Sequence, residues 1–282
     1  MIRAYAKINL GLQILHKRED GYHDIETILH PVNICDEISF GRCDDIRVEC
    51  DHPDVPTDSS NLCCRAAEIL QQSLGIKSGV RIRLEKRIPV GAGLGGGSSD
   101  AAAVLKHLPR YWQVQGTSAL VRELAVSLGS DVSYFLHPGT AKAMGRGEIL
   151  EYFDFELPYW VVVVHPDIRV STTWAYQNFR ANPSAKRVDL KDLLVENRTR
   201  PNVLINRLRN DFEPIVFHAH ELVMRAKEAL YRGGADFALM SGSGSSVFGL
   251  FQDDVLAKDV VKLLQDTYQV FLTEPYFMPG DG

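Results

Sequence analysis

The sequence lacks the features of membrane, secreted and nucleic-acid-coating proteins. Its longest apolar run, around Trp160 to Val164, is far shorter than the roughly 20 residues that a transmembrane helix needs. No charged segment followed by an apolar stretch opens the chain, so no secretory signal is predicted. The net charge of −5 shows no basic excess of the kind that attracts nucleic acid or membrane surfaces. We therefore expect a cytoplasmic protein with neither a nucleic-acid nor a membrane partner.

The chain is also poor in cysteine and has no metal-binding cysteine pattern. Its five cysteines (Cys35, Cys43, Cys50, Cys63 and Cys64) form no C-x-x-C pair and have no partnered histidine spacing. This indicates reduced thiols rather than disulfides or a zinc site. A chain of 282 residues buries about three quarters of its unfolded surface, so it needs neither to fold.

Alternating and helical patterns are mixed along the chain without regular β-α alternation. The segment from Ile2 to Ile14 alternates with period two and predicts a half-buried strand, with Lys7 and Asn9 on its polar face. The pattern restarts with a continuous β-branched run at Trp160 to His165. We predict an α+β protein of two domains, residues 1–155 and 156–282.

The same patterns predict the other elements. Further strands are expected at His23 to Val32, Val80 to Ile88, Phe237 to Met240, Val247 to Phe251 and Val270 to Leu272. Helices are expected from Ser59 or Ser60 to Leu74, from Ser98 to Leu108, at Ser118 to Leu128 and at Asp254 to Leu264, with two or three more after His165 of which the last is Glu221 to Arg232.

A glycine-rich segment, PVGAGLGGGSSDAAA at 89–103, lies between a predicted strand and a predicted helix. Glycines let backbone N–H groups approach a ligand closely, and hydroxyls and a helix N-terminus directly after them favour an anion. A linker, or a helix start capped by Ser98 or Ser99, would be the structural alternative. The segment lacks the acidic residue of a dinucleotide fold, the Gly-Lys-Ser/Thr of a Walker loop and the accompanying motifs of protein kinases. It is therefore predicted to be a phosphate loop of another type.

Three segments together resemble a known family. PVGAGLGGGSSDAA resembles the central motif of the GHMP kinase superfamily, and AYAKINLGL and LMSGSGSSVF resemble its first and third motifs, in the expected order. AKINLGL followed by DGYHDIET most resembles the member kinases of the non-mevalonate isoprenoid pathway. Those enzymes use ATP to phosphorylate the 2-hydroxyl of a methylerythritol that carries a cytidine diphosphate group.

This resemblance implies a fold and a set of ligands. It implies a two-domain GHMP kinase fold, with a ribosomal-protein-like N-terminal domain that binds ATP and a ferredoxin-like C-terminal domain at the substrate cleft. It implies ATP and Mg²⁺ as co-substrate and cofactor. The expected partner is a small molecule bearing a cytidine diphosphate group, with no obligate protein partner.

The resemblance also assigns catalytic residues that the pattern alone leaves open. Asp131 in GSDVSYF is by pattern equally a general base or a helix N-cap, and a strand lysine such as Lys7 is usually only solvated. The resemblance places Asp131 as the base for the substrate hydroxyl and Lys7 as its charged partner. Asn9 would bind the substrate hydroxyls or this catalytic pair, and Ser133 stands where the family commonly has proline.

The implied nucleotide site consists of the glycine loop together with Asn61 near the adenine, although Asn61 is equally well explained as a helix-start residue. The loop residues are Pro89, Val90, Gly91, Ala92, Gly93, Leu94, Gly95, Gly96, Gly97, Ser98 and Ser99.

The implied substrate site reads the cytosine ring with Tyr22 and His23 and closes on it with Tyr176, for which Trp174 and Phe179 are the alternatives. Ser243 is the hydroxyl expected to face substrate and phosphate. No paired carboxylates suggest magnesium ligands, so the metal residues stay open.

Three other functions are compatible with parts of the pattern. Another GHMP kinase, such as a homoserine kinase, would have no use for a cytosine-stacking pair. A non-catalytic small-molecule sensor would keep the fold without needing Lys7, Asp131 and the glycine loop. A nucleic-acid-binding module is disfavoured by the net negative charge.

Overall fold

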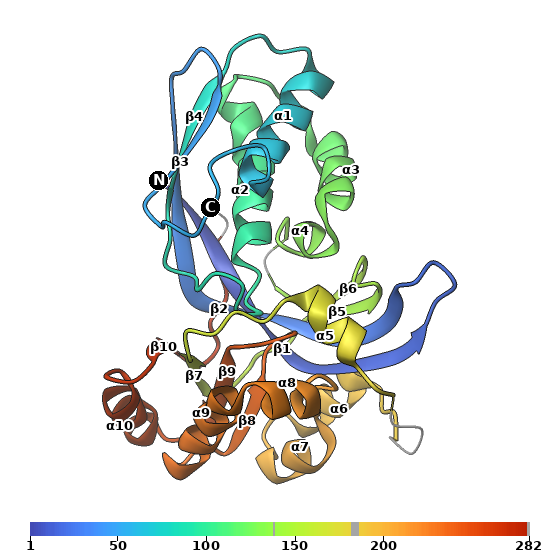
Figure 1. Ribbon diagram of the computed structural model, residues 1–282, viewed down its shortest axis with the longest axis vertical. Helices are drawn as coiled ribbons and strands as arrows, with labels where there is room; N and C mark the ends of the chain where they lie inside the picture. Colours follow the sequence, from blue (N-terminus) through green and yellow to red (C-terminus); the bar gives the residue numbers. More distant parts are fainter. Residues whose placement is uncertain (138, 182–185, 281–282) are drawn as a thin grey trace.

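A computed structural model describes residues 1–137, 139–181 and 186–280 of the protein. Over these ranges the strands form one six-stranded and one four-stranded sheet. Helices α1–α4 with β3 and β4 make up the upper part of Figure 1, the rest of the first sheet extends to mid-height, and the second sheet with α6–α10 makes up the lower part. Strands β1 and β2 run through the junction between the two parts and project from it as a long hairpin.

The first part of the chain supplies the larger sheet and the helices that cover it. Its elements are β1 (Ile2–Lys17), β2 (His23–Gly41), β3 (Ile46–Cys50), α1 (Leu62–Leu74), β4 (Val80–Glu85), α2 (Gly96–Tyr111), α3 (Ser118–Leu128), α4 (Ser130–Tyr134), β5 (Thr140–Gly145) and β6 (Ile149–Phe153). The strand order is β3-β4-β2-β5-β6, with β1 paired antiparallel to β2 and β3 parallel to β4.

The rest of the chain forms the antiparallel sheet β10-β7-β9-β8 and its helices. Its elements are β7 (Trp160–His165), α5 (Thr172–Asn178), α6 (Leu190–Asn197), α7 (Pro201–Arg207), α8 (Glu213–Ala219), α9 (Glu221–Arg232), β8 (Phe237–Met240), β9 (Val247–Phe251), α10 (Asp254–Leu264) and β10 (Gln269–Thr273). After β10 the chain returns to the upper part, where Phe277 packs against Tyr5 with ring centroids 5.6 Å apart.

Strand β1 is more deeply buried than its alternating pattern predicts. Ile8 and Leu10 pack in a core cluster with Val161 and Val163 of the second sheet, while Lys7 on the other face is also buried. The prediction of a half-buried strand is therefore wrong: both faces of β1 are covered, because β1 lies between the two parts of the molecule. Its polar face is turned toward a cavity rather than toward bulk solvent.

Many predicted elements are confirmed, and most differences involve short segments, although β2 continues to Gly41, nine residues past its predicted end at Val32. The strands at 160–165, 237–240 and 247–251 and the helices at 118–128, 221–232 and 254–264 have the predicted bounds. Strands β3, β5 and β6 were not predicted. Five helices, α5–α9, follow β7 instead of two or three, because α5–α8 are only seven or eight residues long and show little periodicity. Within the described residues, no helix has both the length and the apolarity that crossing a bilayer requires.

The predicted domain boundary at residue 155 falls between the two sheets. The first sheet ends at Phe153 and the second begins at Trp160. Phe155 and Leu157 in between belong to a core cluster that includes residues of both sheets. The division into two domains therefore stays a prediction, although the mixed α and β composition is confirmed.

Candidate active site

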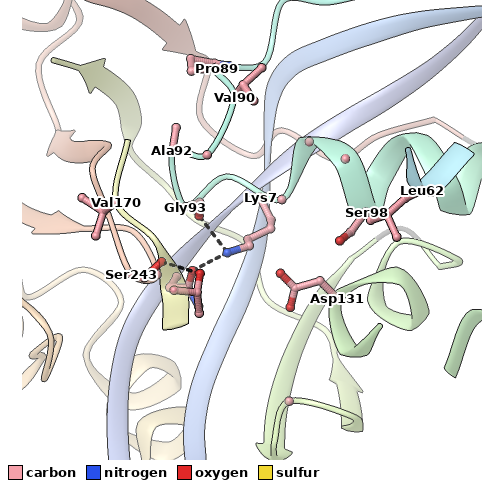
Figure 2. Close-up of a pocket in the computed structure, with 18 of the residues that line it drawn as sticks. Lys7, Leu62, Pro89, Val90, Ala92, Gly93, Ser98, Asp131, Val170 and Ser243 are labelled. Carbon is pink, nitrogen blue, oxygen red and sulfur yellow. Dashed lines mark hydrogen bonds between the residues drawn. The ribbon is translucent and has the colours of Figure 1, made fainter. Parts of the chain in front are cut away.

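A cavity of about 510 Å³ lies where the two parts of the molecule meet. It is lined by the glycine loop, the segment before α1, the middle of β1, the start of β2, the β5–β6 turn, the start of α4, and residues of α5 and the β8–β9 loop. Figure 2 shows the centre of this cavity, with Lys7, Asp131 and Ser98 pointing into it from three different elements.

The glycine loop packs tightly against the loop between β8 and β9. A Cβ added at Gly93 would lie 2.2 Å from the backbone oxygen of Ser241, and the φ of Gly93 is +77°. The Ser246 N–H donates to the Ala92 oxygen at 3.1 Å. Only glycine permits this approach at residue 93, which holds the loop fixed where α2 begins. The first N–H groups of α2, which have no helical acceptors, thus start beside the cavity and favour an anion there.

Lys7 lies at the centre of the cavity and is only 4% exposed. Its Nζ donates to Asn9 Oδ1 at 2.6 Å and to the Gly93 oxygen at 2.8 Å (Figure 2). Burial lowers the pKa of Lys7, and the negative charge of Asp131 acts in the opposite direction. Because both hydrogen-bond acceptors are neutral, the ammonium charge remains available to an anionic group in the cavity.

Asn9 is held in place by hydrogen bonds on both sides of its amide group and positions Lys7. Its Nδ2 donates to Thr27 Oγ1 at 2.9 Å, Thr27 donates to the Gly11 oxygen at 2.6 Å, and Ser241 Oγ donates to Asn9 Oδ1 at 3.3 Å. Of the two roles expected for Asn9, these contacts favour the support of Lys7.

Asp131 faces the cavity from the first turn of α4. Its carboxylate and the Ser98 hydroxyl of α2 both point into the cavity that Lys7 enters from β1 (Figure 2). The hydrogen bonds of the Lys7 ammonium go to Asn9 and Gly93, so Lys7 and Asp131 interact through their charges rather than by direct contact. The arrangement leaves space between a carboxylate and an ammonium beside a helix N-terminus, as transfer of a phosphoryl group to a hydroxyl requires.

Aromatic rings occupy the end of the cavity near α5. Tyr176 lines it, and the His23 ring stacks on the Tyr176 ring with centroids 5.2 Å apart and planes 17° apart. The rings of Phe212 and Tyr176 pack edge to face with centroids 4.9 Å apart. Burial raises the pKa of Tyr176 to about 12. Phe179 contacts His23 edge-on at 6.2 Å. Tyr176 is therefore the aromatic of α5 that reaches the cavity.

Tyr22 is placed differently from the expected position facing Tyr176. It is 58% exposed, and the Arg146 guanidinium lies 4.8 Å from the centre of its ring. Neither Tyr22 nor His23 is among the described residues that line the cavity, whereas Arg146 is. In this structure His23, not Tyr22, is stacked with Tyr176.

Asn61 has the structural role that the pattern allowed and also lines the cavity. As the N-cap of α1, its Oδ1 accepts from the Cys63 N–H at 2.8 Å, and its Nδ2 donates to the Pro56 oxygen at 2.6 Å. It thereby ties the segment before α1 into a wall of the cavity.

A buried charge cluster next to the glycine loop was not predicted. Lys86 bonds both Asp36 and Asp100, the latter at 2.6 Å, and Lys86 and Asp100 line the cavity. Burial raises the pKa of Asp100 to about 7. The N–H groups of Arg87 and Ile88 also donate to Asp36. In the sequence, only Asp100 in SSDAAA pointed to this cluster. The other two members, Asp36 and Lys86, lie in distant parts of the chain.

The structure brings most of the predicted site residues together. Four of them do not line the cavity: Tyr22, His23, Leu94 and Ser99. The Ser99 hydroxyl instead donates to the Tyr5 oxygen at 2.7 Å, which fixes α2 to β1. Ser243 does line the cavity, and its hydroxyl is 2.9 Å from that of Thr172.

The oxygen donors present suit Mg²⁺ bound mainly by a ligand's phosphates. Among the described residues no group of three histidine, cysteine or acidic side chains could form a metal site. Mg²⁺ commonly keeps water and is bound by one or two protein oxygens together with substrate phosphates. The Ser98 hydroxyl and the Asp131 carboxylate are such oxygens and face the same space (Figure 2).

Comparison with known proteins gives consistent matches along the chain. Residues 61–139 match the family model described as the GHMP kinases N terminal domain, and residues 190–269 match GHMP kinases C terminal. The 4-diphosphocytidyl-2-C-methyl-D-erythritol kinase of Prosthecochloris aestuarii is 46% identical over 278 residues, which cover 98% of this chain and 97% of that protein. The enzyme of the same name from Chlorobium phaeobacteroides strain BS1 is 44% identical, with the same coverage.

Solved structures show the same similarity in three dimensions. A crystal structure of 4-(cytidine 5'-diphospho)-2C-methyl-D-erythritol kinase superposes with a TM-score of 0.82 at 32% identity, covering 99% of each chain. A mevalonate kinase superposes with a TM-score of 0.67 at 16% identity, covering 99% of each chain, and this match concerns the fold alone.

Proposed function

Because the chain belongs to the GHMP kinase family, we propose that it transfers the terminal phosphoryl group of ATP to the 2-hydroxyl of 4-diphosphocytidyl-2-C-methyl-D-erythritol. This reaction would be a step of non-mevalonate isoprenoid precursor synthesis. Residues 1–155 would hold ATP, and residues 156–282 would close the cavity on the substrate side. The observation that carries the proposal is the convergence of Lys7, Asp131 and the N-terminus of α2 on one cavity.

Asp131 and Lys7 would act on the attacking hydroxyl. The Asp131 carboxylate takes the proton of the substrate 2-hydroxyl. The hydroxyl oxygen bonds to the terminal phosphorus of ATP, and the bond from that phosphorus to the bridging oxygen, which leaves with ADP, breaks. A positioned base of this kind contributes roughly 10²–10⁴-fold. The Lys7 ammonium, held by Asn9 and Gly93, stabilises negative charge on the reacting oxygens.

The glycine loop and α2 would stabilise the phosphoryl group. Phosphoryl transfer depends chiefly on positioning and on neutralising charge. The N–H groups at the start of α2 provide fixed donors for the phosphate oxygens. Mg²⁺, held by phosphate oxygens and water with the Ser98 hydroxyl as a donor from the chain, would supply further positive charge.

The aromatic end of the cavity would bind the cytosine ring. Tyr176 lines the cavity, and His23 lies on it at stacking distance. A base stacked on an aromatic ring gains about 1–3 kcal/mol. The Tyr176 ring, supported by His23, would therefore distinguish the cytidine substrate from smaller alcohols, with Ser243 beside Thr172 at the start of the same helix.

The Asp131→Asn variant tests this mechanism. We expect kcat to fall at least 100-fold, while calorimetry shows nearly unchanged ATP binding, because the amide keeps the shape of the carboxylate but takes no proton. Asp259→Asn, on the exposed face of α10 and paired with Lys262, serves as the matched control. A kcat for Asp131→Asn within a few fold of wild type would exclude Asp131 as the base.

A further inference from the structure

An ion pair joins the two walls at the nucleotide end of the cavity. Arg169 Nη2, in the segment between β7 and α5, lies 2.6 Å from Asp54 Oδ2, in the segment before α1. The two side chains are 52% and 56% exposed, whereas their neighbours Val170 and Val55 line the cavity. The pair therefore stands at the rim, with one partner from each part of the molecule.

The Arg169 side chain also runs over the glycine loop. A Cβ added at Gly91 would lie 3.6 Å from Arg169 Cγ and 3.9 Å from its Cβ and Cδ. Gly91 is itself exposed and lines the cavity. The stem of the arginine thus lies beside the loop that would hold phosphates, while its guanidinium contacts Asp54.

The charges of the cavity leave a role for this arginine. Among the described lining residues the cations are Lys7, Lys86 and Arg146. Lys86 is neutralised by two buried carboxylates, Arg146 covers the Tyr22 ring, and Lys7 faces Asp131. With Lys7 and Mg²⁺ assigned to the reacting terminal phosphate, only the backbone amides of the loop would then face the inner phosphates of a nucleoside triphosphate.

A guanidinium suits this position, and its present partner is easily exchanged. Its planar set of donors matches phosphate oxygens in a bidentate geometry. An ion pair between half-exposed side chains contributes little to stability, because water screens it. Phosphate, carrying more charge than a single carboxylate, competes effectively for such an arginine.

We propose that Arg169 is a nucleotide-binding residue that contacts the phosphates of ATP, and that Asp54 competes with those phosphates for its guanidinium. The inference rests on the proposed kinase function and adds to it a specific phosphate-binding residue, Arg169, in the segment after β7. It also links nucleotide binding to the position of the wall that carries Val170 and Tyr176, since Arg169 lies in that wall.

Two variants that break the same ion pair distinguish this role from a structural one. We expect Arg169→Gln to raise KM for ATP about tenfold, as for loss of a charged hydrogen bond, and to leave KM for the cytidyl substrate unchanged. Asp54→Asn removes the competitor and should lower KM for ATP two- to threefold. If the ion pair only holds the two cavity walls together, both variants will shift KM for ATP in the same direction. That result would overturn the proposal.

Direct binding measurements separate this inference from the proposed function. Calorimetry of Arg169→Gln should show weaker binding of ATP and ADP but unchanged binding of adenosine, and equal losses for all three would overturn the phosphate contact. Arg87→Gln is the matched control, because it removes another exposed arginine, one paired with Glu37 at 3.7 Å. Wild-type protein that binds no ATP would refute the proposed function itself. Should Arg169→Gln fail to fold, Asp54→Asn and Arg169→Lys still show whether KM for ATP falls or rises when the ion pair is changed.

Discussion

Replacing Gly93 by alanine places a methyl group at the closest contact between the glycine loop and the β8–β9 loop. The added Cβ would lie 2.2 Å from the Ser241 oxygen and 3.0 Å from the Gly244 oxygen. Ordinary contact begins at 3.4 Å, so the two loops must separate by about 1 Å. A displacement of about 1 Å in positioning groups can cost roughly 100-fold in rate.

The effect on stability has two parts, which a second glycine separates. The φ of +77° at Gly93 strains any other residue by about 1–2 kcal/mol, and overpacking adds about 1–3 kcal/mol. Gly116 has nearly the same φ, +72°, but an added Cβ there meets nothing within 4 Å. Gly116→Ala should therefore lose only about 1–2 kcal/mol of unfolding free energy, and Gly93→Ala should lose about 2–5 kcal/mol in all.

Urea unfolding and steady-state kinetics on both variants test this expectation. We expect Gly93→Ala to lose the larger free energy of unfolding and to fall about 100-fold in kcat/KM for ATP, with Gly116→Ala near wild type in activity. If Gly93→Ala matched Gly116→Ala in both measurements, the tight approach of the two loops would not exist and the positioning of α2 would need another explanation.

Three further predictions follow from burial and stacking. Tyr176→Leu should raise KM for the cytidyl substrate about tenfold without changing KM for ATP, whereas Trp174→Leu, whose ring contacts His220 instead, should change neither; equal effects would refute the stacking role. Burial lowers the pKa of Lys7, so the alkaline limb of the kcat–pH profile should lie below pH 10.5, where the ammonium loses its proton. An active Lys7→Arg variant should move this alkaline limb to higher pH, and an unmoved limb would contradict the assignment. Burial lowers the pKa of His30 from 6.5 to about 3, so between these pH values only the unfolded chain binds the proton. The free energy of unfolding should therefore drop by about 2 kcal/mol between pH 7.5 and 5. His30→Gln should make this dependence on pH weaker, and an identical dependence would exclude His30 as its source.

The fold was predictable where one periodic pattern covered a whole element. Glu221–Arg232 and Asp254–Leu264 carry clear amphipathic patterns, and Trp160–His165 is a continuous β-branched run. The depth of β1 was not predictable, because its polar face is covered by residues far away in sequence. The helices α5–α8 are too short for a pattern to distinguish them from loops.

The site was predictable where adjacent residues form a motif, and not where partners come from distant segments. The glycine loop was predicted from its own residues, Lys7 and Asp131 were assigned by the family resemblance of the segments that contain them, and the structure places all three around one cavity. The Lys86 cluster and the Asp54–Arg169 pair join separate strands and loops, so no local pattern indicates them. The stacking of His23 rather than Tyr22 on Tyr176 depends on which way adjacent side chains of β2 and its turn point, and the sequence leaves that undetermined.

Phosphorylation of 4-diphosphocytidyl-2-C-methyl-D-erythritol by the purified protein and ATP tests the central claim most directly, with homoserine and mevalonate as parallel acceptors and the position of the new phosphate determined by NMR. The account predicts rapid turnover of the cytidyl substrate alone, with the phosphate on its 2-hydroxyl. Turnover of homoserine or mevalonate at a comparable rate would contradict the proposed pyrimidine site, and absence of turnover with all three acceptors would contradict the proposed reaction.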